Sequence, residues 1–213
     1  MRKKTNCLIF PLLVMGVFLI FASSCKKDDD DNGVSSFIDS RDGKVYQTVV
    51  IGDQEWMAEN LAYAPSSGNY CAYDNYNSNV ETYGYLYDWQ TALNVCPTGW
   101  HLPSDYEWTE LADYLGDNAG GKLKATGTIE AGTGLWYEPN TGATNETGFT
   151  ALPGAYRNSF GTFFDIGVYG YWWSATEYLA LYAWSRGMTC NYSDVNRSYF
   201  YEEVDFSVRC LRD

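Results

Sequence analysis

Cysteine carries most of the chemistry that this sequence could perform, since its 213 residues include six cysteines and a single histidine. The first to consider is Cys25, because it directly follows the small residues 22–24 (Ala-Ser-Ser). Before them, basic residues 2–4 precede an apolar run over residues 8–21, which is too short for a comfortable membrane span. This order is typical of a signal that is cleaved just before a lipid-modified cysteine. We therefore predict a lipoprotein signal peptide over residues 1–24 and lipidation of Cys25, with an ordinary secretory signal as the alternative.

Four more cysteines lie in the part of the chain that would be exported: Cys71, Cys96, Cys190 and Cys210. An even number of cysteines in an oxidising compartment predicts two disulfides, and the spacing leaves all three pairings open. None of the four forms a Cys-x-x-Cys pair, and His101 is the only histidine. A zinc site of the Cys/His type therefore lacks its ligands.

Catalytic side chains are harder to find in this sequence. A Ser-His-acid triad would need His101 as its base, and we favour a packed or hydrogen-bonded imidazole there. The carboxylate pairs Glu107/Glu110 and Glu202/Glu203 are more simply a helix cap and a solvated face. A glycosidase would need two carboxylates facing each other across a cleft, which spacing along the chain does not establish. We therefore predict that the protein is not an enzyme.

The segment after Cys25 indicates where the chain is held. Residues 26–31 (KKDDDD) resemble the export tag of surface lipoproteins in Bacteroidetes, and they would equally serve as a solvated linker. Apolar groups are scarce, so we predict a flexible acidic tether over residues 25–38 and one folded domain over residues 39–213. The net charge of −13 repels phosphate backbones, which argues against nucleic acid as a partner. The expected location is the outer membrane, at the cell surface, with the membrane reached through the lipid anchor.

The elements that would position these residues are short. Residues 45–51 and 54–57 predict a hairpin around a Gly-Asp turn. Residues 83–95 have apolar side chains at helical spacing, and residues 105–115 follow a Ser-x-x-Glu capping box, so both predict helices. Beyond residue 121 the glycine-broken sequence predicts strands only, over residues 149–152, 162–166, 171–175, 181–186 and 204–211. In the last strand the even-numbered residues are apolar and predict the buried face. Two early helices followed by short strands favour the α+β class.

Five segments of the chain together resemble one known family. They are DGKVYQTVVIGDQEWMAENL (42–61), YGYLYDWQTALNVCPTGWHLPSDYEWTELADYLG (83–116), NTGATNETGFTALPGAYRN (140–158), GYWWSATE (170–177) and FSVRCLRD (206–213). They closely resemble the Fibrobacter succinogenes major paralogous domain, which is common in surface and secreted proteins. The resemblance implies a C-type-lectin-like domain with two helices, small antiparallel sheets and long irregular loops, related in plan to the formylglycine-generating-enzyme domain. It implies no particular activity, and the reactive cysteine pair of the formylglycine-generating enzymes is missing here.

The resemblance also implies a disulfide pairing. In C-type-lectin-like domains, a cysteine at the end of the first helix bonds to one in the last strand. Here these positions correspond to Cys96 and Cys210, which leaves Cys71 for Cys190.

A calcium site is a further implication of the resemblance. Sugar-binding C-type lectins use a Glu-Pro-Asn triplet to hold calcium and two hydroxyls of a sugar, and this chain has that triplet at residues 138–140. Glu138, Asn140 and Asn145 are therefore candidate calcium ligands, since calcium prefers several hard oxygen atoms. The Trp-Asn-Asp sequence that follows in those lectins is absent, so we favour a structural turn in which asparagines bond to the local backbone.

Aromatic residues make up 17% of the chain and crowd its second half, so they offer another candidate surface. Aromatic faces stack on sugar rings and anchor interfaces, although a fold poor in regular structure also needs them for its core. We predict that at least one of Trp136, Tyr171 and Trp172 lines an exposed groove. Because neighbours in a strand point to opposite sides, at most one of Trp172 and Trp173 should belong to the core.

These inferences together predict a surface-anchored domain without enzymatic activity that binds a glycan or a protein. One alternative is an enzyme related to the formylglycine-generating domain. Another is a structural tip or cap of a surface assembly, which would show a large apolar patch instead of a polar groove.

Overall fold

The computed structural model describes residues 34–213, so the predicted signal peptide and Cys25 lie outside the described residues. The last five residues of the predicted tether, Val34–Ile38, form strand β1 and pair with the next strand. The reason is an apolar anchor that the composition of the tether concealed, because the ring of Phe37 stacks on Trp100 with centroids 4.5 Å apart. Within residues 34–213, no helix has both the length and the apolar character needed to cross a membrane.

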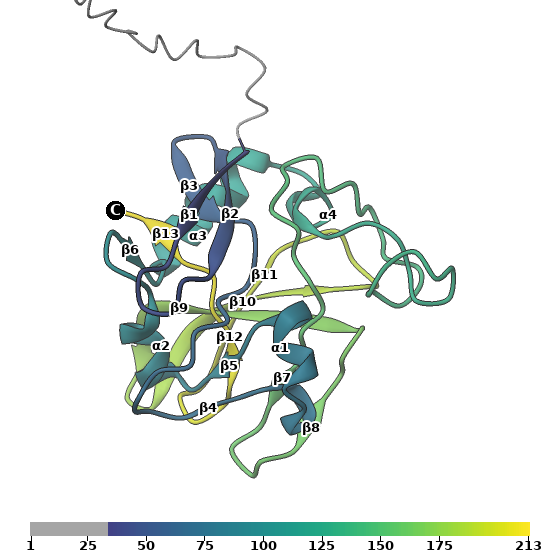
Figure 1. The fold of residues 1–213 in the computed structure, drawn as a ribbon. Coiled ribbons are helices and arrows are strands. Elements are labelled where there is room, and N and C mark those ends of the chain that lie inside the picture. Colours follow the sequence, from purple (N-terminus) through teal and green to yellow (C-terminus); the bar gives the residue numbers. More distant parts are fainter. Residues whose placement is uncertain (1–33) are drawn as a thin grey trace, which may run out of the picture. The chain divides into compact units, whose positions relative to one another are not determined.

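Short strands dominate the fold, as Figure 1 shows. The strands are β1 (Val34–Ile38), β2 (Val45–Ile51), β3 (Gln54–Met57), β4 (Tyr70–Cys71), β5 (Leu86–Tyr87), β6 (Trp100–His101), β7 (Tyr156–Arg157), β8 (Phe163–Phe164), β9 (Tyr169–Leu179), β10 (Tyr182–Thr189), β11 (Asn196–Tyr201), β12 (Phe206–Ser207) and β13 (Leu211–Arg212). The helices are the 3-10 turn η1 (Tyr73–Asn75), α1 (Ser78–Tyr83), α2 (Trp89–Val95), α3 (Asp105–Leu115) and α4 (Ala119–Leu123).

The strands form two larger sheets and one small one within the described residues. The first sheet has the order β1-β2-β3-β13-β6, the second β11-β10-β9-β12-β5-β4, and the third is the pair β7-β8. Every named pair is antiparallel except β12 with β9, which are parallel. The structure thus combines helices with antiparallel sheets, as expected for an α+β fold.

Two local predictions are confirmed. Strands β2 and β3 form the hairpin, and α3 spans the predicted helix. The capping box of α3 is present, because the Ser104 side chain accepts the Glu107 N–H while the Glu107 carboxylate accepts the Ser104 N–H. Trp108 and Leu111 of this helix are fully buried.

The helix predicted over residues 83–95 is wrong in its first half. Gly84 caps the end of α1 with φ of +73°, and a Cβ there would lie 2.6 Å from the Leu61 carbonyl oxygen. The chain then enters β5, and α2 begins only after Asp88, whose side chain accepts the Thr91 N–H. Helices α1 and α4 were not predicted, because six and five residues are too few to show a helical period.

The prediction for residues 204–211 is also corrected. They form no continuous strand: β12 belongs to the second sheet and β13 to the first. Both faces of the segment are buried, because it crosses the centre of the molecule between the two sheets. On this path the Val208 and Cys210 carbonyls accept the backbone N–H groups of Leu61 and Met57. The predicted strand over residues 149–152 is only an isolated bridge, between Lys124 and Ala151.

Strand β9 separates two halves of the core. Trp173 packs in the cluster that contains Phe206 and the buried face of α2, whereas Trp172 packs in the cluster that contains Trp108 of α3. Both indoles are fully buried, so the prediction that at most one belongs to the core is wrong. The reason is that both faces of this central strand are covered, one by each helix.

Candidate binding groove

One of the two implied disulfides is present. Cys96, at the end of α2, is bonded to Cys210. Cys71 and Cys190 are both free and buried, so the predicted bond between them is absent and that prediction is wrong. They lie in different core clusters, Cys71 beside Asp205 and Cys190 among the side chains packed around Trp136. Burial raises the pKa of the Cys71 thiol to about 12, which makes it a poor nucleophile.

Of the three aromatic residues predicted to line a groove, only Tyr171 does so. Trp136 and Trp172 are fully buried. Their indole N–H groups are satisfied inside the core, by the Ala151 carbonyl for Trp136 and by the Asn60 side chain for Trp172. The half-buried Tyr171 lies beside a shallow hollow of about 300 Å³ on the face of β9, β10 and β11.

The three candidate calcium ligands are not arranged as a metal site. Asn140 is buried and its amide donates to two backbone carbonyls of residues 125–127. The Asn145 amide both donates to and accepts from Thr150, while Glu138 is exposed. Within residues 34–213, no three His, Cys, Asp or Glu side chains are placed to hold a metal together. This arrangement fits the alternative interpretation, a structural turn.

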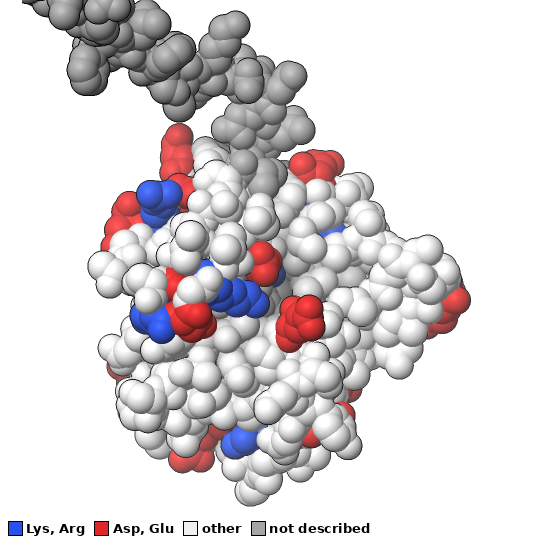
Figure 2. All heavy atoms as spheres, viewed as in Figure 1, with Lys and Arg blue, Asp and Glu red and all other residues white. Residues whose placement is uncertain are grey.

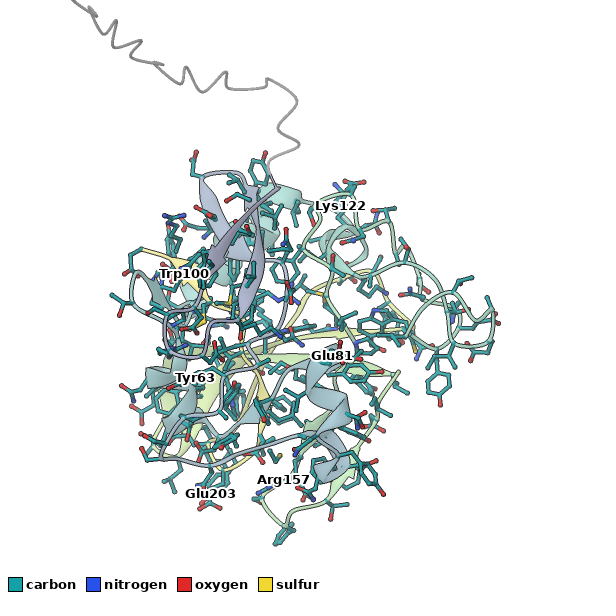
Figure 3. All side chains as sticks on the ribbon, in the orientation of Figure 1. Tyr63, Glu81, Trp100, Lys122, Arg157 and Glu203 are labelled. Atoms are coloured by element: carbon teal, nitrogen blue, oxygen red, sulfur yellow. A yellow bond between two sulfur atoms is a disulfide. The ribbon has the colours of Figure 1, made fainter. Side chains whose placement is uncertain are left out.

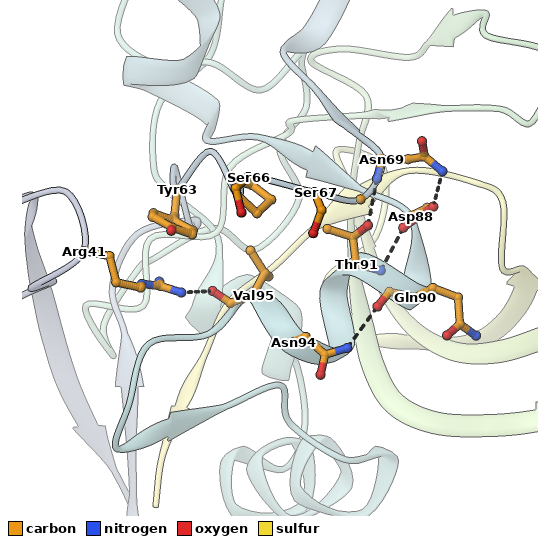
Figure 4. A pocket seen from close by; sticks show the side chains of 12 residues that line it. Arg41, Tyr63, Ser66, Ser67, Asn69, Asp88, Gln90, Thr91, Asn94 and Val95 are labelled. Carbon is orange, nitrogen blue, oxygen red and sulfur yellow. Dashed lines mark hydrogen bonds between the residues drawn. The ribbon is translucent and has the colours of Figure 1, made fainter.

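A larger hollow lies where the loop before β4 meets α2, and we call it the α2 groove (Figure 4). Its volume is about 470 Å³. It is lined by Arg41, Tyr63, Pro65, Ser66, Ser67, Gly68, Asn69, Asp88, Gln90, Thr91, Asn94 and Val95.

The loop is held tightly against the start of α2. Asp88 caps the helix through one carboxylate oxygen and accepts the Asn69 amide through the other, at 2.7 Å. The Asn69 N–H donates to the Thr91 hydroxyl at 2.8 Å. A Cβ at Gly68 would lie 2.3 Å from that hydroxyl oxygen, and φ there is +100°, so this close approach needs glycine. The groove wall is therefore preformed.

Arg41 closes one end of the groove. Its guanidinium donates to both oxygens of Asp39, donates to the Val95 carbonyl at 2.8 Å, and lies 3.7 Å from the centre of the Tyr63 ring. Burial acts to raise the pKa of Asp39, but the hydrogen bonds from Arg41 outweigh it, so that pKa lies below its ordinary value. Tyr63 is thus held by a cation on one side and stays half-buried.

The groove offers hydrogen-bonding groups beside an aromatic ring. Asn69, Gln90 and Asn94 contribute amides, which donate and accept, and all three are exposed. Two serine hydroxyls and the Asp88 carboxylate add to them. Such a lining can form hydrogen bonds with a ligand rich in hydroxyl groups.

The lone histidine lies elsewhere, beside α3. The His101 ring contacts Asp213 through Nδ1 at 2.8 Å and Glu107 through Nε2 at 3.0 Å. The Ser104 hydroxyl donates to the far oxygen of Glu107 and is not bonded to the imidazole. This geometry is not that of a catalytic triad, in which the base contacts the serine.

Residues 49–212 match the family described as the Fibrobacter succinogenes major domain. The chain belongs to this family. A search of curated proteins found no match, and a search of solved structures found none either. The residues that match the Fibrobacter succinogenes major domain include the loop and helix of the α2 groove together with His101 and Glu107, whereas Arg41 and Asp39 precede the matched residues and Asp213 follows them.

The α2 groove was not predicted from the sequence. A usable signal was present, since Pro65, two serines, Gly68 and Asn69 predict a polar loop. The Asp88-x-x-Thr91 spacing also resembles that of a helix cap, which would have placed the start of α2. The contact between the two segments is non-local and leaves no pattern in either one.

We expect the His101 cluster to make stability depend on pH. Burial lowers the pKa of His101, but the hydrogen bonds to Asp213 and Glu107 raise it more, so it lies above its ordinary value. The stabilisation is then fully present below the unfolded pKa of about 6.5 and is lost as the pH rises through the folded pKa. Urea unfolding of wild type and His101→Gln should therefore show a difference in free energy that shrinks as the pH rises. A difference independent of pH would contradict this assignment.

Proposed function

We propose that the α2 groove binds a neutral glycan, and that the protein does so without catalysis while held at the outer-membrane surface by a lipid on Cys25. The observation that carries the proposal is the lining of the groove, in which three exposed amides, two serine hydroxyls and a carboxylate line the same hollow as a half-buried tyrosine. Amide and carboxylate groups match the hydroxyl groups of sugars, and aromatic rings pack against the apolar faces of sugar rings.

The size of the groove favours a glycan over a protein ligand. A volume of about 470 Å³ lies in the range of sites for small ligands. A stable protein interface needs about 800 Å² on each partner, which calls for a broad surface instead. Figure 2 shows the charged side chains of the described residues in small groups on a largely uncharged face. A neutral ligand suits such a surface.

The disulfide supports a C-type-lectin-like plan for the domain. It joins the end of α2 to the segment just before the final strand, β13. This is the pairing that the resemblance implies. We infer that the two larger sheets correspond to the two antiparallel sheets of such a domain.

A glycan array tests the proposed function on the full chain in detergent. Binding to neutral oligosaccharides is expected, and Gln90→Ala/Asn94→Ala should weaken it by about tenfold or more, since each substitution removes hydrogen bonds to the ligand. The matched control is Asn191→Ala, which removes an exposed amide that does not line the groove. Wild-type binding that survives the double substitution, or an array without any bound glycan, would refute the proposal.

The lipid anchor has its own test. Cells grown with an alkyne-bearing fatty acid should label the wild-type protein, and Cys25→Ser should lose the label completely, because the thioether has no other attachment point. Cys71→Ser is the control and should keep the label, since Cys71 is buried. An unlabelled wild-type protein would exclude lipidation.

A structural role is a second candidate, because an exposed aromatic patch covers the far end of β9, β10 and β11. Tyr178 and Tyr199 stack with centroids 4.1 Å apart, and Tyr178 meets Trp184 at 4.7 Å. Leu179 and Leu181 beside them are at least half exposed. Such a patch is typical of protein contact surfaces, but it has no groove for a small ligand.

A further inference from the structure

A second hollow, of about 220 Å³, shares Asn69 and Asp88 with the α2 groove, and we call it the Asp205 hollow. Its other lining residues are Arg157, Ser159, Glu203 and Asp205. Arg157 and Glu203 lie near one another at the lower end of the molecule in Figure 3. Asn69 and Asp88, which are bonded to each other, line both the groove and the hollow. The two hollows therefore adjoin, and a long ligand bound in the groove would extend into the Asp205 hollow.

The Asp205 carboxylate is almost completely buried, but only one of its two oxygen atoms contacts a partner. Its Oδ2 contacts Arg157 Nε at 2.8 Å and the Cys71 thiol at 3.8 Å. Among the described residues, no hydrogen-bond donor reaches Oδ1. The backbone that carries this carboxylate is held in place, because the N–H groups of residues 157 and 205 donate to each other's carbonyls at 3.2 and 2.9 Å. Oδ1 is not sealed in the core, so a hydrogen-bond donor on a ligand in the hollow can reach it.

The charges around this hollow favour a cation. Three carboxylates, those of Asp88, Glu203 and Asp205, face a single guanidinium. Burial raises the pKa of Asp205 to about 7 in spite of the nearby Arg157, and the Asp88 carboxylate adds to the rise. An anionic ligand would be repelled here, whereas a positively charged group that donates hydrogen bonds would satisfy both the charge and the free oxygen.

We propose that the Asp205 hollow is the subsite for the ammonium group of an amino sugar in the bound glycan. The inference rests on the proposed function of the α2 groove. The hollow is smaller than sites that hold a whole small ligand, so it suits one unit of a longer chain whose other units occupy the groove. The glycan is then neutral along the groove and carries its positive charge at one end.

Calorimetric titration of the full chain in detergent tests the subsite with two trisaccharide probes: one has a single glucosamine unit at one end and otherwise neutral sugars, and the other is the same trisaccharide with that amine N-acetylated. In low-salt buffer the charged trisaccharide should bind about tenfold more tightly, as expected for one hydrogen bond between charged groups. Glu203→Gln keeps the shape of the hollow, removes one charge and touches nothing in the groove, so it should reduce this preference several-fold. Its control is Glu177→Gln, which removes an exposed carboxylate elsewhere.

The outcomes separate the subsite from the groove. Equal affinity for the two trisaccharides, binding of neither, or a preference that survives Glu203→Gln would overturn the subsite. Loss of neutral-glycan binding in Gln90→Ala/Asn94→Ala would still support the groove in each of these cases. A preference lost equally in Glu177→Gln would show a long-range effect of net charge and would also overturn the subsite.

Discussion

Replacement of Arg209 by methionine is expected to lower the free energy of unfolding by about 3–4 kcal/mol, because several buried acceptors would lose their donor at once. Arg209 is fully buried in the segment that crosses between the two larger sheets. Its guanidinium donates to the backbone carbonyls of Met57, Phe149 and Thr150 and to the Asn60 side chain. Methionine fills a similar volume but offers no donor, so these oxygen atoms would remain buried and unpaired.

The matched control for this prediction is Arg212→Met. Arg212 lies three residues later, is half exposed and pairs with Glu55 at 2.9 Å. A surface pair of this kind contributes less than about 1 kcal/mol, so the control should unfold close to wild type in urea. Equal losses for Arg209→Met and Arg212→Met would show that the buried guanidinium contributes no more than a surface ion pair.

Arg209 holds irregular segments together, and Lys124 does the same elsewhere in the core. The buried Lys124 ammonium donates to the Thr141, Thr189 and Tyr192 carbonyls at 2.9–3.0 Å. Burial lowers the pKa of Lys124 to about 8 and that of Arg209 to about 9, because neither side chain has a carboxylate bonded to it. Loops lack the regular ladder of backbone hydrogen bonds, so a cation with several donors satisfies their carbonyls instead.

Local sequence patterns were enough to predict the hairpin and α3. The Gly52-Asp53 turn fixes the hairpin between two alternating strands, and the Ser104–Glu107 capping box fixes the first turn of α3. Each signal acts within a few residues, so the rest of the fold does not change it.

Non-local contacts explain what the sequence did not reveal. Alternation along residues 204–211 suggested one buried face, yet Asp205 and Arg209 are also buried, because the segment is enclosed by two sheets and its charges are bonded internally. The same holds for Trp172, whose burial depends on α3 covering one face of β9. The α2 groove depends on Gly68 meeting Thr91, a contact that neither segment encodes by itself.

Removal of the disulfide by Cys96→Ala/Cys210→Ala should cost roughly 4–5 kcal/mol in free energy of unfolding, the largest loss we expect from any change discussed here. The two cysteines are 114 residues apart, so their bond closes a loop of more than half the chain. In the chain-entropy account, a crosslink over so long a loop removes many conformations from the unfolded chain, and its loss restores them. Urea unfolding of wild type and variant measures the difference.

The matched control, Cys71→Ala/Cys190→Ala, removes the two free thiols and separates pairing from simple loss of sulfur. It should cost about 1 kcal/mol per site, as for small cavities left in a core. Reductant makes the comparison sharper, because wild type and control contain the disulfide and should both lose stability in reductant, whereas Cys96→Ala/Cys210→Ala should not change. Sensitivity to reductant that disappears in the Cys71/Cys190 variant, or persists in the Cys96/Cys210 variant, would show that the pairing is different. The bond also supports the groove, because it ties the end of α2, and with it one wall of the groove, to the residue just before β13 in the first sheet.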